Sequence, residues 1–499
     1  MTEQARIVCI SNRLPVSARE SEGKIEFQPS SGGLVTAIGP ILRSSSGLWI
    51  GWPGQVSSTD QQVHDSLKEF SAQSEFELIP VALDQKSLAG FYQGFSNSII
   101  WPLFHDLQSR CNFDTEFWST YLHVQGLFST EAQKHIRPND IVWVHDYHLM
   151  GLGRELRRVN ISNKMIFFLH TPFPGPDIFF KLPWRLDLID ALLSYDLIGF
   201  QTKRDLKNFI DCVEAITGRK CARRGSLFVG KSDSRECLMG AFPISIDFNE
   251  FEEIARSEEV ANSAQMIRAD MGVEYLIVGV DRLDYTKGIP DRIRAFRRLL
   301  EMEPALKKKI ALLQVVVPSR EEVPEYQQLR SEIEQLVTQL NGSFGEPGWV
   351  PVHHLFRSLT RAEVVAMYRA ADVAIVTPIK DGMNLVAKEY CASRINNGGA
   401  LVLSEFAGAA EELGEFAFLV NPYDIEGVAR ALSQALNSSK EDSRGRMKGL
   451  RDVIRAADVF VWARSFLSAA QWNLNSENVA PQRKNIWDKL KRISGVFDI

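Results

Sequence analysis

Residues 275–303 read YLIVGVDRLDYTKGIPDRIRAFRRLLEME, and this stretch contains the unit from which the fold is built. The apolar run from Tyr275 to Val280 has the length expected of a strand buried on both faces. After a polar loop, a helix is expected from Pro290 to Glu303, because proline is favoured in a first helical turn. Its apolar face consists of Ile293, Phe296, Leu299 and Leu300. A strand, a loop and an amphipathic helix in this order predict a parallel sheet covered by helices.

The same alternation extends along the chain in both directions. In the second half, strands are expected at Ile310–Val317, Val373–Thr377, Ala400–Leu403 and Phe418–Val420. In the first half, strands are expected at Ile7–Ile10, Ile141–Val144, Met165–Leu169 and Leu197–Phe200, with a helix at Arg204–Ile216. We therefore predict an α/β fold of two doubly wound, Rossmann-like domains that face a cleft.

The boundary between the two domains is expected near Pro243–Asp247. The stretch before it, Thr217–Glu236, is rich in glycine, serine and basic residues and is typical of a loop. Its basic cluster (Arg219, Lys220, Arg223, Arg224) is interpreted as a solvated hairpin or loop rather than an anion site. The predicted domains are 1–245 and 246–455, followed by a helical segment, 456–499, that packs back across them.

Composition excludes several classes of function. The chain has 499 residues, 45% of them hydrophobic, and a formal net charge of -5, so neither nucleic acid nor an anionic membrane is an expected partner. The six cysteines are scattered and have no zinc-site spacing. No signal peptide or run of about 18 apolar residues is present, so we expect a cytoplasmic protein.

The loop after the Tyr275 strand carries two cations, Arg282 and Lys287, at the carboxyl end of a parallel strand. Ligands of open α/β sheets bind at this edge. A diphosphate leaving group gains negative charge as its glycosidic bond breaks, and two fixed cations would stabilise that charge in place of a metal ion. The alternative is that both are ordinary surface cations of a polar loop.

A second polar loop, residues 377–390, reads TPIKDGMNLVAKEY. Gly382 allows a tight turn, and Asn384–Val386 open a helix whose free backbone N–H groups can bind phosphate. Asp381 is placed to bind hydroxyls of a transferred sugar, and Glu389, one helical turn further, to bind ribose hydroxyls. An Asp-Gly turn and a helical glutamate can also be purely structural.

Eight motifs occur in order along the chain: ISNRLPV (10–16), SGGLV (31–35), GLWIGW (47–52), WVHDYHL (143–149), FFLHTPFP (167–174), DLIGFQT (196–202), DRLDYTKG (281–288) and DGMNLVAKEY (381–390). This series resembles glycosyltransferase family 20, the family of the trehalose-6-phosphate synthases, from about Ile7 to beyond Asp424. The resemblance implies a GT-B fold, transfer of glucose from UDP-glucose to glucose 6-phosphate with retention, and a place in trehalose biosynthesis and stress protection. It implies no bound metal or other cofactor.

The resemblance also assigns roles to individual residues. The acceptor-binding set is Arg13, Tyr92 and Arg320 for the phosphate, Asp146 for hydroxyls, and Trp101 beside the sugar. The donor-binding set is Gly32, Gly33, His170, Arg282, Lys287, Asp381, Gly382, Met383, Asn384, Leu385, Val386, Ala387, Lys388 and Glu389. The expected catalytic residues are Asp146, His170, Arg282 and Lys287. Two guanidiniums and a phenol suit a phosphate dianion.

Several alternatives stay open. A sister synthase could use another phosphorylated acceptor, such as glycerol 3-phosphate, and a regulatory subunit could bind sugar phosphates without catalysis. The nucleotide could be UDP, GDP or ADP, and the protein could form a homo-oligomer. The chain has no DxDxT phosphatase motif, so a separate enzyme is expected to remove the product phosphate. The chain departs from the family at Ser245 and Phe248, where glycine and proline are usual, and this departure could alter the domain junction.

Overall fold

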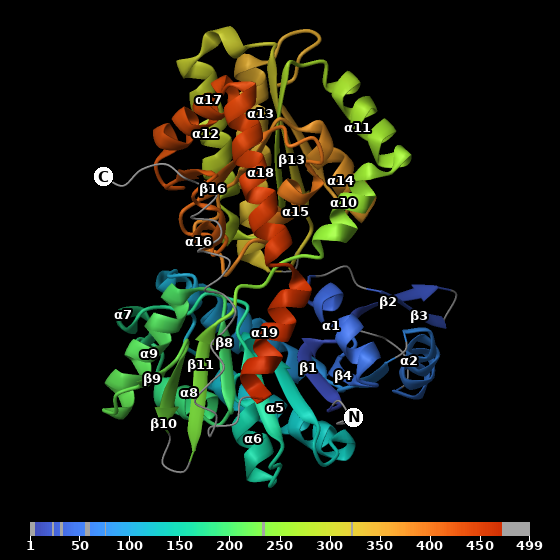
Figure 1. The fold of residues 1–499 in the computed structure, drawn as a ribbon, viewed down its shortest axis with the longest axis vertical. Helices are drawn as coiled ribbons and strands as arrows, with labels where there is room; N and C mark the ends of the chain where they lie inside the picture. Colours follow the sequence, from blue (N-terminus) through green and yellow to red (C-terminus); the bar gives the residue numbers. More distant parts are fainter. Residues whose placement is uncertain are drawn as a thin grey trace.

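The computed structural model describes residues 5–21, 24–29, 33–54, 60–74, 76–231, 235–320 and 323–471. These residues form an α/β protein with two largely parallel sheets, stacked along the long axis of the molecule (Figure 1). The larger sheet has strand order β5-β4-β1-β6-β7-β8-β11-β10-β9, and the smaller has order β14-β13-β12-β15-β16-β17. The predicted fold class is confirmed. No helix among the described residues is long and apolar enough to cross a membrane.

The strands of the larger sheet are β1 (Ile7–Arg13), β4 (Leu48–Trp52), β5 (Glu77–Pro80), β6 (Ile141–His145), β7 (Lys164–Phe168), β8 (Leu197–Phe200), β9 (Ala222–Arg224), β10 (Leu227–Lys231) and β11 (Glu236–Ala241). Of these, β1, β6, β7 and β8 coincide with the apolar runs expected in the first half. A separate antiparallel pair is formed by β2 (Val16–Ser21) and β3 (Lys24–Pro29). The core strands pair in parallel and are buried along most of their length, as continuous apolar runs require.

The stretch 217–236, expected as a loop, contains strands β9 and β10. The two strands form an antiparallel hairpin that pairs with β11 and extends the sheet. Leu227 and Val229 are buried and anchor the hairpin. Two apolar residues are too few to be recognised in the sequence as a strand pattern. Lys220 pairs with Glu214 and Arg224 with Glu236, so these two cations of the cluster have carboxylate partners.

The smaller sheet repeats the strand–loop–helix unit. Its strands are β12 (Tyr275–Arg282), β13 (Ile310–Val317), β14 (Val352–Phe356), β15 (Val373–Val376), β16 (Ala400–Ser404) and β17 (Phe418–Val420). β12 and β13 pair in parallel over their full length, from Tyr275 opposite Ile310 to Arg282 opposite Val317. The helix that follows β12 is α12 (Ile289–Met302), whose face of Ile293, Phe296, Leu299 and Leu300 is buried as predicted.

Helices cover both sheets. Those around the larger sheet are α1 (Gly33–Ser44), α2 (Asp60–Ser74), α3 (Gln85–Ser87), the π-helix η1 (Leu88–Ile100), α4 (Trp101–Phe104), α5 (Thr115–His135), α6 (Leu152–Arg158), α7 (Pro176–Phe179), α8 (Arg185–Leu192) and α9 (Lys203–Thr217). Those around the smaller sheet, besides α12, are α10 (Phe248–Arg256), α11 (Glu258–Met271), α13 (Pro324–Phe344), α14 (Arg361–Ala370), α15 (Leu385–Ser393), α16 (Ala410–Leu413), α17 (Ile425–Asn437) and α18 (Lys440–Ala456).

Within the described residues, the chain passes between the sheets twice. It leaves the larger sheet after β11 and returns through α18 to α19 (Val459–Gln471), which lies against the larger sheet (Figure 1). There the Trp462 indole N–H donates to the Phe242 carbonyl oxygen at 3.1 Å. Ser245 at the first crossing is fully buried and is not among the described residues with positive φ, so serine fits the backbone without left-handed strain. Phe248 is buried at the start of α10, where Arg455 lies 4.3 Å above its ring. The rest of the predicted C-terminal segment, 472–499, lies outside the described residues.

Candidate active site

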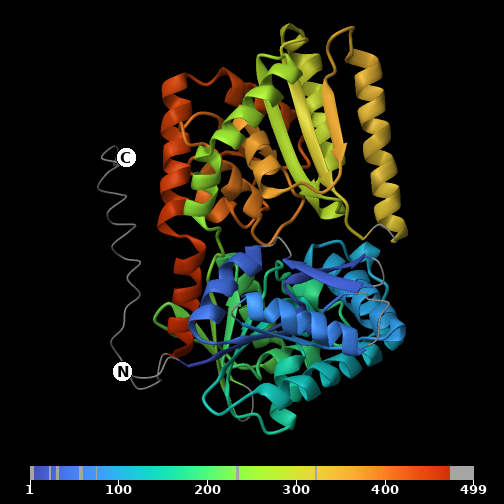
Figure 2. The ribbon, with the colours of Figure 1, turned by 90° about the vertical axis from the view of Figure 1, so that its right-hand side faces the viewer.

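The two sheets face each other across the middle of the molecule (Figure 2), and several predicted site residues lie at the strand ends beside this boundary. Arg13 is the last residue of β1, and Asp146 directly follows β6. From the other sheet, Arg282 is the last residue of β12, and Arg320 lies just beyond β13. The carboxyl ends of parallel strands collect loops at one edge, and here both sheets direct that edge to the same region. Residues more than 300 positions apart are thereby brought together.

Arg320 joins the two sheets on the acceptor side of the site. Its guanidinium lies 4.7 Å from the centre of the Trp101 ring and donates to the Tyr147 hydroxyl at 3.4 Å, and both of these residues belong to the first half of the chain. It also hydrogen-bonds the Tyr326 hydroxyl and lies 3.8 Å from a carboxylate oxygen of Asp284. These contacts fix the guanidinium while its side chain remains 12% exposed.

Arg13 lies on the other side of the same group of aromatic residues. Its guanidinium stands 4.8 Å from the centre of the Trp52 ring, and Trp52 in turn contacts Tyr92. Tyr92 stacks on His148 with the ring planes 10° apart. The pKa of His148 is lowered to about 3, first by burial and then by the charges of Arg320 and Arg13. Two arginines thus flank a neutral histidine and a phenol, an arrangement suited to a phosphate dianion.

Asp146 presents a carboxylate close to His170. Its φ of 69° is left-handed, and its Oδ1 accepts a hydrogen bond from the His170 backbone N–H at 3.2 Å. Burial raises the pKa of Asp146 to about 6, although backbone N–H groups and the charge of Arg282 act to lower it. The His170 Nε2 lies 3.2 Å from the His145 Nδ1, and burial lowers the pKa of His170 to about 3. His170 is therefore a neutral hydrogen-bonding group at ordinary pH.

On the donor side, Lys287 and Asp381 form an ion pair. The Lys287 Nζ lies 2.6 Å from Asp381 Oδ2, and the Asn384 side-chain amide donates to the same oxygen at 3.1 Å. Burial acts to raise the pKa of Asp381, but the Lys287 ammonium holds it below its usual value. Arg282 is exposed, and among the described residues it makes no ion pair, so its guanidinium is available to an anionic ligand.

Gly382 lets the loop before α15 approach the loop after β7. A Cβ atom on Gly382 would lie 2.1 Å from the carbonyl oxygen of His170, and one on Gly408 would lie 1.9 Å from the Gly382 oxygen. Only glycine permits these approaches. Asn384, with φ 73°, precedes the first turn of α15, and its Oδ1 is buried without a hydrogen-bond partner among the described residues. The turn and the helix start predicted for this loop are both present.

The remaining donor-loop residues lie in different surroundings. Met383 and Ala387 are buried, whereas Leu385 and Val386 are half-buried against the core. The Glu389 carboxylate accepts a hydrogen bond from the Tyr368 hydroxyl at 3.2 Å, and burial raises its pKa. The Lys388 ammonium, 2% exposed, donates to the Ile244 carbonyl oxygen at 2.8 Å and pairs with Glu412, so it is held away from the other site residues. Gly33 is the first residue of α1, and Gly32 lies outside the described residues.

Four residues of the site were missed in the sequence. Tyr147, Asp284 and Tyr326 surround Arg320, and His105 packs on Trp101. Tyr147 and Asp284 are letters of motifs already singled out, HDYH and RLDY, so their position beside known site residues was a usable signal. Nothing in the sequence distinguishes Tyr326 or His105, because their position depends on how the two sheets are placed.

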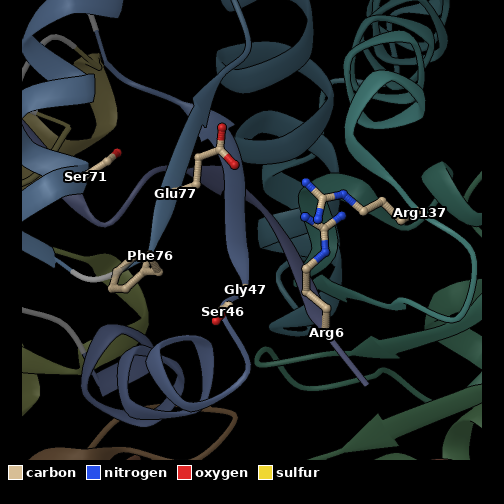
Figure 3. Close-up of a pocket in the computed structure, with 7 residues that line it drawn as sticks. All are labelled: Arg6, Ser46, Gly47, Ser71, Phe76, Glu77 and Arg137. Carbon is tan, nitrogen blue, oxygen red and sulfur yellow. The ribbon is translucent and has the colours of Figure 1, made fainter. Parts of the chain in front are cut away.

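A cavity of about 340 Å³ lies elsewhere, at the amino ends of β1, β4 and β5 (Figure 3). It is lined by Arg6, Ser46, Gly47, Ser71, Phe76, Glu77 and Arg137. Arg6 is already paired there, with its guanidinium 2.6 Å from Asp140. The site residues stand at the carboxyl ends of the strands, so this cavity is not part of the candidate active site.

Comparison with known proteins shows which proteins the chain resembles. A model of glycosyltransferase family 20 matches residues 5–471. The trehalose-6-phosphate synthase of Mycobacterium avium is 43% identical over 469 residues, which cover 93% of this chain and 94% of that protein. An α,α-trehalose-phosphate synthase (UDP-forming) of Burkholderia xenovorans, solved in complex with glucose-6-phosphate, superposes with a TM-score of 0.85 at 33% identity, covering 94% of this chain and 100% of that one. An E. coli structure bound with UDP-2-fluoro glucose superposes with a TM-score of 0.85 at 34% identity and the same coverage.

Proposed function

The chain belongs to glycosyltransferase family 20, and we propose that its site transfers glucose from UDP-glucose to glucose 6-phosphate. The products are α,α-trehalose 6-phosphate and UDP. The observation that carries this proposal is the arrangement of cations: Arg13 and Arg320 flank one set of aromatic side chains, while Arg282 and Lys287 lie at the end of β12 and in the loop after it, with Lys287 paired to Asp381. The site thus offers separate places for a phosphorylated acceptor and a diphosphate donor.

The acceptor phosphate is held by Arg13, Tyr92 and Arg320, and Trp101 packs beside the sugar. Asp146 accepts hydrogen bonds from acceptor hydroxyls, which directs the anomeric hydroxyl toward C1 of the bound glucose. Holding two substrates in this orientation supplies much of the rate enhancement, because a bimolecular encounter becomes a step within one complex. Arg320 comes from one sheet and Arg13 from the other, so the acceptor is held from both sides.

Transfer proceeds on the face from which the leaving group departs, so configuration is retained without a protein nucleophile. The acceptor oxygen bonds to C1 as the bond from C1 to the β-phosphate oxygen breaks, and the acceptor proton passes to that oxygen. Negative charge grows on the leaving diphosphate, where Arg282 and Lys287 stabilise it more than in the ground state. The N–H groups at the start of α15 add to this, and Glu389 is assigned to the ribose hydroxyls.

Substrate identity is tested with a panel of donors and acceptors. Product analysis should show turnover with UDP-glucose and glucose 6-phosphate, and poor use of unphosphorylated glucose. Preference for glycerol 3-phosphate would overturn the acceptor assignment while leaving the glycosyltransferase assignment in place. We further propose a cytoplasmic enzyme made of domains 1–245 and 246–455 with a returning C-terminal segment, which acts as a monomer or homo-oligomer before a separate phosphatase.

The two acceptor arginines give a sharper test. Each charge-assisted contact to the phosphate contributes about 1.5–3 kcal/mol, so Arg13→Ala or Arg320→Ala should lower kcat/KM for glucose 6-phosphate by about 10- to 150-fold. The affinity for UDP should change little, as calorimetry would show. Arg330→Ala removes an arginine that pairs with Glu334 on the surface of α13 and is the matched control. Full activity of both acceptor variants would rule out the phosphate-binding role.

A further inference from the structure

His105 lies at the centre of the site, although the mechanism above does not use it. It directly follows α4, its side chain is 3% exposed, and its ring packs on the Trp101 indole with the ring centres 4.2 Å apart. Trp101 belongs to the proposed acceptor side. Packing fixes the orientation of a histidine in this position, so the hydrogen-bonding direction of its second ring nitrogen is fixed as well.

The hydrogen bonds of His105 determine which nitrogen carries the proton. Its Nδ1 lies 2.7 Å from the Trp101 carbonyl oxygen, and a carbonyl only accepts, so Nδ1 carries the hydrogen. Burial lowers the pKa of His105 to about 4, so the ring is neutral at ordinary pH. The Nε2 atom is therefore an acceptor. It has no hydrogen-bond partner among the described residues and is not sealed from solvent.

The charged groups that act on His105 lie across the boundary between the two sheets. They are Asp284, Asp381 and Lys287, all from the smaller-sheet half of the chain. The next residue, Asp106, is 2.5 Å from the Lys380 ammonium, so residues 105–106 run alongside residues 380–381. Asp381 uses Oδ2 for Lys287 and Asn384, and its Oδ1 has no partner among the described residues. Two unused acceptors, Asp381 Oδ1 and His105 Nε2, thus belong to neighbouring segments.

We infer that His105 is a specificity-determining residue for the donor: its Nε2 accepts a hydrogen bond from a hydroxyl group of the transferred glucose, beside Asp381. This inference rests on the proposed function, since it needs a hexose between Asp381 and Trp101. Arg282 and Lys287 can only donate, so sugar hydroxyls, which must also donate, require such acceptors. A site with a fixed acceptor rejects an analogue that lacks the matching hydroxyl, because the acceptor is then left unpaired.

The test pairs substitutions at His105 with deoxy analogues of the donor. UDP-glucose and its 3-, 4- and 6-deoxy analogues are each assayed with glucose 6-phosphate, using the parent protein, His105→Phe and His105→Gln. The expected loss in kcat/KM for UDP-glucose in His105→Phe is roughly 5- to 30-fold. In the parent, kcat/KM should be lower for one deoxy analogue than for UDP-glucose. This difference, the deoxy penalty, should disappear in His105→Phe and return in part in His105→Gln, which keeps an acceptor oxygen.

Controls separate this inference from its premise. His123→Phe, at an exposed histidine on α5, should retain the activity and the analogue penalties of the parent. If the parent does not turn over UDP-glucose, the proposed function fails. If the parent is active but every deoxy penalty is unchanged in both folded His105 variants, the inference alone fails. Deoxy analogues of glucose 6-phosphate are assayed in the same way with UDP-glucose. The inference is overturned if it is one of these analogues whose loss in kcat/KM disappears in His105→Phe, because His105 would then bind the acceptor. Circular dichroism establishes that each variant is folded.

Discussion

At the scale of single residues, the two donor cations differ in their surroundings. Lys287 is largely buried and bound to Asp381, whereas Arg282 is exposed and forms no ion pair in the described part of the chain. A cation without a protein partner attracts an anionic ligand more strongly than a paired cation, because the field of the paired cation is partly offset by its carboxylate. We therefore expect Arg282 to interact with the leaving diphosphate directly, and Lys287 to act together with Asp381 in positioning the donor.

Replacing Arg282 tests the charge stabilisation. Because the guanidinium acts on charge that grows in the transition state, Arg282→Ala should lower kcat by about 100-fold or more. Arg297→Ala, on the outer face of α12, is the control and should leave turnover unchanged. Steady-state kinetics measure both. Activity should also persist in EDTA, since the proposed mechanism gives Arg282 and Lys287 the role that a metal ion would otherwise have, and a strict need for a divalent ion would contradict it.

The raised pKa of Asp146 predicts a pH dependence. The ionised carboxylate is a stronger acceptor of hydroxyl hydrogen bonds than the protonated acid, and the pKa of Asp146 is raised to about 6. Acceptor use should therefore be full above this pH and fall as pH drops through it, by about tenfold per unit well below the pKa. Phosphate monoesters also titrate near pH 6, at about the same value. Asp146→Asn is the control. Its activity should be lower, and its profile of kcat/KM against pH should show one protonation step instead of two.

At the scale of elements, helix α15 is connected both to the loop before it and to the crossing between the sheets. Its N-terminus belongs to the donor loop, and one turn later the Lys388 ammonium joins the Ile244 carbonyl oxygen to the Glu412 carboxylate. Ile244 lies in the crossing between the sheets, next to the buried Ser245. The helix that carries the donor loop is thereby attached to the chain segment that connects the two halves. This attachment orients the loop relative to the larger sheet.

Breaking this attachment should cost stability. Lys388→Met leaves the Glu412 carboxylate without a cation, and breaking a buried pair from one side costs about 3–5 kcal/mol. The midpoint of thermal unfolding should fall by roughly 6–15 °C. Differential scanning fluorimetry measures the change. In the double variant Lys388→Met/Glu412→Gln the unpaired charge is gone, so part of the loss should be recovered, and a double variant no more stable than the single one would contradict the ion-pair explanation.

At the scale of the whole molecule, several polar contacts join the halves around the site. Lys380 pairs with Asp106, and the Glu411 carboxylate accepts hydrogen bonds from the backbone N–H groups of Lys203 and Arg204 at the start of α9. Asp106 is half exposed, and exposed pairs contribute at most about 1 kcal/mol each. Contacts of this strength can hold the halves together with substrates bound and still separate to admit them.

We expect the halves to open and close during turnover. Small-angle scattering should show a smaller radius of gyration with UDP and glucose 6-phosphate together than without ligands. The double variant Lys380→Ala/Glu411→Ala should require several-fold higher ligand concentrations for the same compaction, because the closed arrangement has lost contacts. Lys207→Ala, which removes a pair on the outer face of α9, is the control. Identical radii with and without ligands would rule out the closure.

Much of this protein was predictable from the sequence, because local pattern and motif order carry the relevant physics. Apolar runs of strand length placed β1, β6, β7, β8, β12, β13, β15, β16 and β17 to within three residues, and the proline at the start of α12 marked its first turn. The hairpin of β9 and β10 was anticipated only as a solvated hairpin or loop and not as part of the sheet, since only Leu227 and Val229 anchor it. The order of the motifs was enough to identify the family.

The sequence by itself determined the fold class, the family and the polar residues that each strand delivers to its carboxyl end, because these depend on short-range periodicity and on motifs. Only the tertiary structure decided which of those residues meet. In the structure, Arg320 lies over Trp101, the Lys388 ammonium donates to the Ile244 carbonyl oxygen, and His105 lies beside residues 380–381. The physical reason is that each contact joins residues distant in sequence, and its geometry depends on how two separately folded sheets pack, which no local pattern encodes.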